Sequence, residues 1–209
     1  MNTEKKRLCV LVSGTGTNLQ AILDAIKNNE LIGFEVSVVI SNKKEAYALK
    51  RAESEGIANL FLNPKDFANN LDFDRKLIEI INTHEVDLIV LAGYTKILTD
   101  IFINSFPNKI INIHPALLPN FGGRGMYGER VHEAVLQSGV KESGCTVHFV
   151  TLEVDKGPII VQKKVSVLPN DTVESLSKRI LAEEHKSLVE AIKKVLSCSH
   201  YCESVSPKQ

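Results

Sequence analysis

The chain has 209 residues, enough for one α/β domain with a sizeable core or at most two small domains. It is 44% hydrophobic and 24% charged, and its 25 basic and 25 acidic residues give a formal net charge of zero. This balance argues against a nucleic-acid-binding or membrane-binding surface. The polar start, Met1–Arg7, is not a signal peptide, and no stretch approaches the roughly 20 apolar residues of a membrane span. We therefore expect a cytoplasmic protein that binds neither nucleic acid nor a membrane.

The first predicted elements resemble a phosphate-binding unit. Leu8–Val12 predicts a strand buried on both faces, Ser13–Asn18 is a glycine-containing turn, and Leu19–Ile26 has helical periodicity. Free N–H groups at the start of such a helix attract an anion. The turn is not a dinucleotide fingerprint, because Leu19 stands where the third glycine would be and no acidic residue follows the second strand, Phe34–Ser41. A single phosphate group is the favoured ligand, and an ordinary strand-to-helix turn is the alternative.

Strands and helices then alternate along the chain. The pattern predicts helices at 46–54 and 73–81 and strands at 59–62 and 88–92. This alternation is typical of an α/β fold with a mostly parallel sheet and right-handed crossovers. Such sheets bind ligands at the carboxyl ends of their strands, where residues 13–18, 93–98 and 112–114 all fall.

The next predicted strand carries two polar residues at its end. Ile110–Ile113 is apolar except for Asn112, and His114 follows before Pro115 stops the strand. Side chains two residues apart on a strand share a face, so Asn112 and His114 project together. An amide beside an imidazole can polarise a carbonyl group and move a proton. Alternatively, both side chains only satisfy the backbone of a turn.

The second half of the chain predicts antiparallel strands. A glycine-rich loop at 120–128 could be a mobile lid or a solvated connector, and a helix follows at 129–138. Cys145–Val150 alternates as a half-buried strand and is joined by a short turn to a strand at 159–165, so the sheet is mixed. Asp171 and Glu174 suggest a capping box that begins a helix running to about Leu196. Residues 197–209 have the composition of a disordered tail.

The four cysteines predict neither disulfides nor a metal site. Cys9 and Cys145 lie in apolar strand patterns and are expected to be buried thiols. Cys198 and Cys202 flank His200 but lack a second ligand pair at zinc-site spacing. A reducing compartment and a site without metal fit this pattern best.

Five motifs recur in the same order in a known family. They are Ser13–Asn18, Leu91–Tyr94, Asn112–Pro119, Val147–Val150 and Asp155–Pro158. Over roughly residues 7–196 the chain resembles the phosphoribosylglycinamide formyltransferase family of folate-dependent enzymes. The resemblance implies a Rossmann-like formyltransferase fold, with a single domain over 1–196, a nucleotide-binding N-terminal part, a folate-binding and catalytic C-terminal part, and a tail at 197–209. The implied reaction transfers the formyl group of 10-formyltetrahydrofolate to the amine of 5-phosphoribosylglycinamide in purine biosynthesis.

The resemblance also implies roles for individual residues. Asn112, His114 and Asp155 match the family's catalytic set. Gly16, Thr17 and Asn18 match the loop that holds the substrate phosphate, and Glu184 matches a ribose-binding glutamate. The folate segments match Thr95, Lys96, Ile97 and Leu98, together with Asn112, Thr151, Leu152, Glu153, Val154 and Asp155. Asn70 stands where many members have an arginine that touches the glutamate tail of the folate. The expected partners are small molecules, without a metal, and the chain is expected to be a monomer or a homodimer.

Three alternatives remain beside this interpretation. A methionyl-tRNA formyltransferase would need a further RNA-binding domain, whereas only 13 residues follow Leu196. A formyltetrahydrofolate hydrolase would have little use for a phosphate loop. A non-catalytic nucleotide-binding module would not need the set formed by Asn112, His114 and Asp155.

Overall fold

The computed structural model describes residues 5–197. By its internal contacts the chain divides into two compact units, Met1–Ile111 and Asn112–Gln209. The boundary falls inside strand β5 (Ile110–His114).

The first unit is built on parallel strands, as the alternating sequence pattern predicts. Its strands are β1 (Lys6–Val12), β2 (Phe34–Ser41), β3 (Ala58–Phe61) and β4 (Leu88–Leu91), in the order β3-β2-β1-β4 with the start of β5 beside β4. The pairs β1–β2, β1–β4 and β2–β3 are all parallel. The central strands are continuous apolar runs, and Leu8 to Val12 are completely buried.

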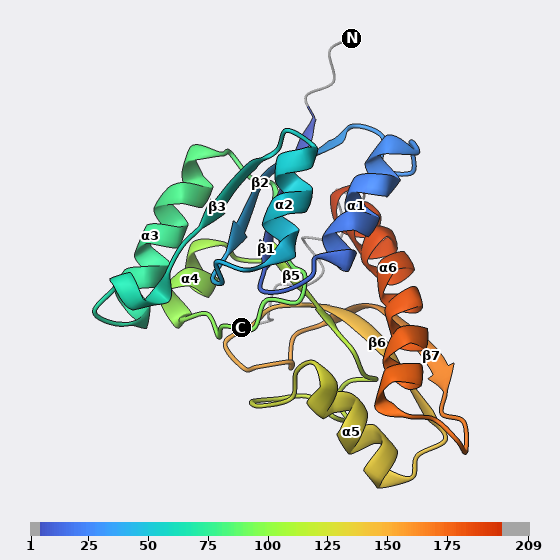
Figure 1. The fold of residues 1–209 in the computed structure, drawn as a ribbon. Coiled ribbons are helices and arrows are strands. Elements are labelled where there is room, and N and C mark those ends of the chain that lie inside the picture. Colours follow the sequence, from blue (N-terminus) through green and yellow to red (C-terminus); the bar gives the residue numbers. More distant parts are fainter. Residues whose placement is uncertain (1–4, 198–209) are drawn as a thin grey trace, which may run out of the picture. The chain divides into compact units, whose positions relative to one another are not determined.

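Helices flank these strands in the first unit (Figure 1). They are α1 (Thr17–Lys27), α2 (Tyr47–Ser54), α3 (Asn70–Thr83) and α4 (Asp100–Ser105), with a 3₁₀ turn η1 at Pro64–Asp66. Helix α2 packs on β2, β3 and α1, while α3 packs on α4. Asn69 caps α3 because its side chain accepts a hydrogen bond from the amide of Asp72 at 2.9 Å. The sequence pattern did not predict α4 or the 3₁₀ turn, which are too short to show a full helical period.

The second unit contains the antiparallel part of the sheet, in the order β5-β6-β7. Strands β6 (Glu142–Phe149) and β7 (Ile159–Ser166) pair antiparallel. Helix α6 (Val173–Ser197) packs on both strands and on α5 (Glu129–Ser138). The prediction of an α/β fold with a mostly parallel sheet and antiparallel strands near the C-terminal half is therefore confirmed.

Strand β6 differs from its prediction as a half-buried strand. Every residue from Ser143 to Phe149 is buried. Helix α6 covers one face, where the Cys145 Sγ lies 3.4 Å from the Ser187 Oγ. The segment after β5 covers the other face, where the Thr146 hydroxyl donates to the carbonyl of Ala116 at 2.6 Å. The alternation of polar and apolar residues therefore reflects hydrogen-bonded polar groups rather than exposure to solvent.

The start of α6 also differs from the predicted capping box. Thr172 and Ser175 form the reciprocal pair, since each side chain accepts from the other's amide, at 3.2 and 2.9 Å. Asp171 instead accepts from the Leu168 amide at 2.7 Å and from two guanidinium nitrogens of Arg179. Helix α6 ends at Ser197, one residue beyond its predicted end. The rest of the predicted tail, with Cys198 and Cys202, lies outside the described residues.

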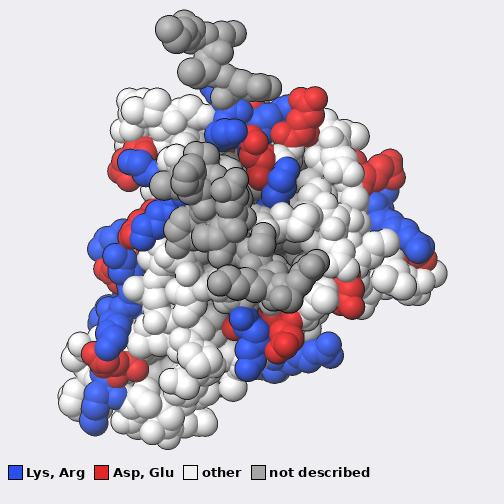
Figure 2. All heavy atoms as spheres, turned by 180° about the vertical axis from the view of Figure 1, so that it is seen from behind, with Lys and Arg blue, Asp and Glu red and all other residues white. Residues whose placement is uncertain are grey.

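Charged side chains of both signs are intermingled on the face shown in Figure 2. This distribution agrees with the formal net charge of zero. Across residues 5–197, every helix falls short of the length or the apolar character that a membrane crossing requires.

Candidate active site

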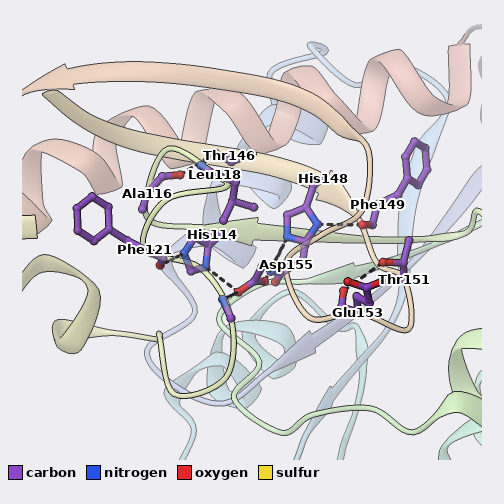
Figure 3. Close-up of polar contacts among 12 residues, drawn as sticks. His114, Ala116, Leu118, Phe121, Thr146, His148, Phe149, Thr151, Glu153 and Asp155 are labelled. Atoms are coloured by element: carbon purple, nitrogen blue, oxygen red, sulfur yellow. Dashed lines mark hydrogen bonds and ion pairs between the residues drawn. The ribbon is translucent and has the colours of Figure 1, made fainter. Parts of the chain in front are cut away.

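Three side chains that the sequence singled out meet in the second unit. Asn112 and His114 lie two residues apart on β5 and therefore share a face of the strand. His114 lies beside Asp155, which enters from the loop between β6 and β7 (Figure 3). The His114 Nδ1 lies 3.7 Å from the Asp155 Oδ2, and their side chains are only 4% and 10% exposed. The structure thus places a histidine against a carboxylate in a largely dry environment.

His114 has different partners at its two ring nitrogens. Its Nε2–H donates to the carbonyl oxygen of Phe121 at 2.8 Å, so in the neutral ring Nδ1 carries the lone pair and faces Asp155. Burial lowers the pKa of His114, and the negative charge of Asp155 partly opposes that shift. A proton that binds at Nδ1 therefore forms an ion pair with Asp155.

The backbone of a short loop holds Asp155 in place. The loop closes where the Phe149 amide donates to the Pro158 carbonyl at 2.9 Å. A Cβ at Gly157 would collide with the Phe149 carbonyl oxygen, so this position accepts only glycine. Asp155 itself has a left-handed backbone with φ of 57°. Burial raises the pKa of Asp155, but the opposing effects of His148, His114 and the Gly123 amide are larger, so the net pKa is lowered and the carboxylate is ionised. The Gly123 amide donates to Oδ2 at 2.9 Å.

His148, on β6, is a site residue to which the sequence interpretation gave no role. Its Nδ1–H donates to the Phe149 carbonyl at 2.9 Å, which leaves Nε2 as the acceptor of the neutral ring. That Nε2 lies 3.2 Å from the Asn112 Nδ2, from which the neutral ring accepts, and 3.5 Å from the Asp155 Oδ1, to which only the protonated ring can donate. His148 therefore fixes the orientation of the Asn112 amide and leaves its second N–H free to serve a ligand.

Hydrogen bonds from the side chains of Thr146 and Gln162 anchor the turn that follows His114. The Thr146 Oγ1 donates to the Ala116 carbonyl and accepts from the Leu118 amide at 3.1 Å. It also accepts from the Gln162 Nε2 at 2.9 Å, which in turn reaches the Leu118 carbonyl at 3.0 Å. These bonds fix the backbone immediately beyond the end of β5.

The glycine-rich loop at 120–128 contributes backbone atoms to the same cluster. The Phe121 carbonyl contacts His114, and the Gly123 amide contacts Asp155. The start of this loop is therefore part of the site. Among the described residues, the loop contacts His114 and Asp155 through Phe121 and Gly123, and not through Arg124 or Tyr127.

In the first unit, the predicted phosphate turn lies tightly against α2. Gly16 is the N-cap residue of α1 and has left-handed backbone angles, φ 75° and ψ 28°. A Cβ at Gly16 would lie 2.6 Å from the Ala48 Cβ, so a side chain would separate the turn from α2. Thr17 and Asn18 begin α1, and Asn18 is buried. These amides lie where an anion is attracted by the positive end of a helix dipole.

Ser13 connects this turn to one predicted folate segment. Its hydroxyl donates to the Asn42 Oδ1 at 2.6 Å and accepts from the Thr95 amide at 2.9 Å. The Lys96 Nζ lies 2.5 Å from the Asn70 Oδ1 and 4.8 Å from the centre of the Phe73 ring. The Asn70 side chain therefore holds the neighbouring Lys96 cation.

The remaining predicted ligand residues differ in accessibility. In the first unit Ile97 is 49% exposed and Leu98 is buried. In the second unit Leu152 is 56% exposed, Val154 is half-buried, and Glu184 is buried on α6. Thr151 and Glu153 are exposed, and the Thr151 hydroxyl donates to the Glu153 carbonyl at 3.1 Å.

The buried cysteines are poorly suited to nucleophilic chemistry. Cys9 and Cys145 are free thiols without exposed surface, as the sequence predicted. Burial raises the pKa of Cys145 to about 11 and raises that of Cys9 as well. Within residues 5–197, no three His, Cys, Asp or Glu side chains are grouped so that they could hold a metal ion.

Comparison with known proteins connects this site to a family. The profile of the family described as "Formyl transferase" matches residues 6–192. Phosphoribosylglycinamide formyltransferase of Haemophilus influenzae is 43% identical over 181 residues, which cover 87% of this chain and 82% of that protein. The crystal structure of glycinamide ribonucleotide transformylase 1 from Symbiobacterium toebii aligns with a TM-score of 0.86 and 45% identity, over 96% of this chain and 89% of the other.

Other relatives are longer than this chain. The chloroplastic phosphoribosylglycinamide formyltransferase of Arabidopsis thaliana is 42% identical over 90% of this chain, which spans 64% of that protein's length. The chain spans only 14% to 19% of several animal relatives. The similarity nevertheless extends over nearly all of the present sequence, with the profile match running through both units. This chain belongs to the formyl transferase family.

Proposed function

We propose that this chain, acting as one formyltransferase domain over residues 1–196, transfers the formyl group of 10-formyltetrahydrofolate to the amine of 5-phosphoribosylglycinamide. The products are formylglycinamide ribonucleotide and tetrahydrofolate, in purine biosynthesis. The observation that carries the proposal is the cluster in which Asp155, from the loop after β6, meets Asn112 and His114 at the end of β5. The names of relatives such as the Haemophilus influenzae enzyme support the choice of substrates.

The chemistry requires a site that stabilises charge on the formyl oxygen. The neutral amine attacks the formyl carbon, a new C–N bond forms, and negative charge develops on the oxygen. The free N–H of the Asn112 amide, oriented by His148, can donate to that oxygen. The His114 Nδ1 is the ring nitrogen not engaged by Phe121, and in its protonated form it can donate a second hydrogen bond or a proton.

Asp155 supplies the balancing charge and the proton acceptor. Its ionised carboxylate stabilises the His114 imidazolium across 3.7 Å. It can also take, through water, the proton that the attacking amine loses as the bond to the folate N10 breaks. The proton that the attacking amine loses is passed on to N10, so tetrahydrofolate leaves as a neutral amine and no proton is gained or lost overall. The step needs neither a covalent enzyme intermediate nor a metal.

Substrate binding is assigned by the same proposal. Gly16, Thr17 and Asn18 hold the phosphate of the ribonucleotide, and Glu184 binds its ribose. The folate lies along the Thr95–Leu98 and Thr151–Asp155 segments, whose exposed Ile97 and Leu152 offer apolar surface to a flat ring. Lys96, held by Asn70, is the cation for the carboxylates of the folate tail.

We propose a cytoplasmic enzyme whose partners are the two small-molecule substrates, without nucleic acid, membrane or metal. A monomer or a homodimer would both be compatible with the catalytic cluster, since all its members come from one chain.

A single assay tests the function. The protein is mixed with 10-formyltetrahydrofolate, with and without phosphoribosylglycinamide, and the folate product is followed by absorbance. Turnover that depends on the ribonucleotide supports the proposal, with His114→Ala as the inactive comparison. Equal turnover without the ribonucleotide would identify a hydrolase instead, and no turnover in either mixture would refute the proposal.

A further inference from the structure

We propose that Arg51 on α2 is a positioning residue for the phosphate subsite, because it turns the Thr15–Gly16 peptide so that the amide N–H groups of the loop face the substrate. The inference rests on the proposed function, in which this loop binds the phosphate of the ribonucleotide. Arg51 acts through the backbone of the loop, without touching the reacting atoms.

Three contacts hold the Arg51 side chain, and one of them is with the loop. Its Nε donates to the Thr15 carbonyl at 2.9 Å, and its Nη1 donates to the Gln20 Oε1 at 2.9 Å. The guanidinium carbon lies 5.1 Å from the centre of the Tyr47 ring. One planar group therefore connects the glycine turn, the first turn of α1 and the start of α2.

A second contact turns the preceding peptide in the same direction. The Ala48 amide, in the first turn of α2, donates to the Gly14 carbonyl at 3.2 Å. Two consecutive carbonyls, those of Gly14 and Thr15, therefore point at α2. Positions 48 and 51 lie on one face of the helix because they are three residues apart.

The orientation of the amides follows from the geometry of the peptide bond. In a trans peptide the C=O and the following N–H point in opposite directions. The N–H groups of Thr15 and Gly16 therefore point away from α2. Successive amides that face the same way, with one residue in the left-handed region, form a concave anion site, and Gly16 has φ of 75°. Gly16, as N-cap, has no side chain with which to fill this site.

The shape of the guanidinium explains why an arginine fits here. Arginine presents several donors in a fixed plane, and this one uses Nε and Nη1 on different acceptors at once. A lysine at position 51 could replace only one of these hydrogen bonds and would leave the Thr15 peptide free to rotate. Charge alone would therefore not reproduce the effect.

Steady-state kinetics of Arg51→Gln and Arg51→Lys test the proposal. For Arg51→Gln we expect the KM for phosphoribosylglycinamide to rise roughly tenfold, with kcat and the KM for the formyl donor within about twofold of the wild type. For Arg51→Lys we expect this KM to rise at least about threefold, because lysine keeps the charge but cannot form both guanidinium hydrogen bonds. Lys50→Gln is the matched control: it removes the same charge one residue away, where Lys50 lies near Tyr47, and should change nothing beyond about twofold.

A substrate without phosphate provides the decisive comparison. With ribosylglycinamide, wild type and Arg51→Gln should have equal kcat/KM, whereas inorganic phosphate as a competitive inhibitor should bind Arg51→Gln roughly tenfold more weakly. An unchanged KM for the ribonucleotide, or a defect that persists with ribosylglycinamide, would overturn the positioning role. An equal defect in Lys50→Gln would also overturn it, because long-range charge would then suffice.

Failure of the proposed function has a different signature. In that case the wild type itself would not use the ribonucleotide, and the role of Arg51 would be decided by titrating ¹⁵N-labelled proteins with inorganic phosphate. The Gly16 amide resonance should shift in the wild type and in Lys50→Gln, and roughly tenfold more phosphate should be needed in Arg51→Gln. Equal titration curves would refute the inference. Should Arg51→Gln melt at a much lower temperature than the wild type, Arg51→Lys carries the same comparisons.

Discussion

Replacing Asp155 with asparagine tests the electrostatic core of the proposed mechanism. Asparagine tolerates the left-handed backbone of this position, where φ is 57°, and its side-chain oxygen can still accept from the Gly123 amide. The substitution therefore removes a charge and leaves the loop in place. Alanine or glutamate at the same position would add strain or displacement to the loss of charge.

The expected effect follows from the distance between the two groups. Unit charges 3.7 Å apart attract by about 4.5 kcal/mol at an effective dielectric constant of ~20, so the carboxylate strongly favours the charged form of His114. Burial already lowers the pKa of His114, and without the charge of Asp155 that pKa falls further. The fraction of imidazolium at neutral pH then drops, and we expect kcat to fall by roughly 10² to 10³ with both KM values nearly unchanged.

Two measurements check this prediction. Steady-state formyl transfer at saturating substrates gives kcat, and NMR titration of the His114 ring gives the direction of its pKa change. The control is Glu142→Gln on β6, the same acid-to-amide change at an exposed ion pair with Lys164 of β7, which should retain turnover within about twofold. A folded Asp155→Asn protein with near-normal kcat would refute the reasoning, as would a His114 pKa that rises.

Three further substitutions test other parts of the structure. His148→Phe removes the acceptor that orients the Asn112 amide, so kcat should fall roughly 10- to 100-fold with little change in KM, and unchanged kcat would contradict this role. Thr146→Val leaves the buried partners of the hydroxyl unsatisfied and should lower the free energy of unfolding in urea by about 1–3 kcal/mol. An unchanged urea midpoint would contradict the anchoring role of Thr146. Asp171→Asn should destabilise the protein above pH ~4, because Arg179 holds the pKa of Asp171 well below its ordinary value, and the gap to the wild type should close as the pH falls through that depressed value. A gap that does not depend on pH would exclude this linkage.

Most of the fold is predictable because burial leaves a strong signature in this sequence. The strand Phe34–Ser41 and the helix Glu129–Ser138 have the predicted bounds, since apolar runs and helical periodicity define them without tertiary information. Helix α4 is a single short segment and carries no comparable signal. Strand β6 begins at Glu142, three residues before its prediction, because Glu142, Ser143 and Gly144 are poor strand formers that are paired with β7.

The site was predictable to the extent that it is local. Asn112 and His114 emerge from the two-residue repeat of one strand, but Asp155 could be connected to them only through the family resemblance. His148 was missed because its alternation with apolar neighbours suggested solvent, whereas the covering segment comes from about 30 residues earlier in the chain. The Phe121 carbonyl and the Gly123 amide are backbone groups, so no pattern of side chains in the sequence predicts their contacts.

The closed loop that carries Asp155 also bears on how this protein could be changed by evolution or by engineering. Its ends are joined by the Phe149–Pro158 hydrogen bond, and Gly157 allows no side chain, so the length of the loop is fixed. Leu152 and Glu153, by contrast, face outward and support nothing within the loop through their side chains. Under the proposed function, a library confined to these two positions would vary the surface offered to the formyl donor while the carboxylate stays in place. Selectivity for the donor and the catalytic carboxylate could then be changed independently within a single loop.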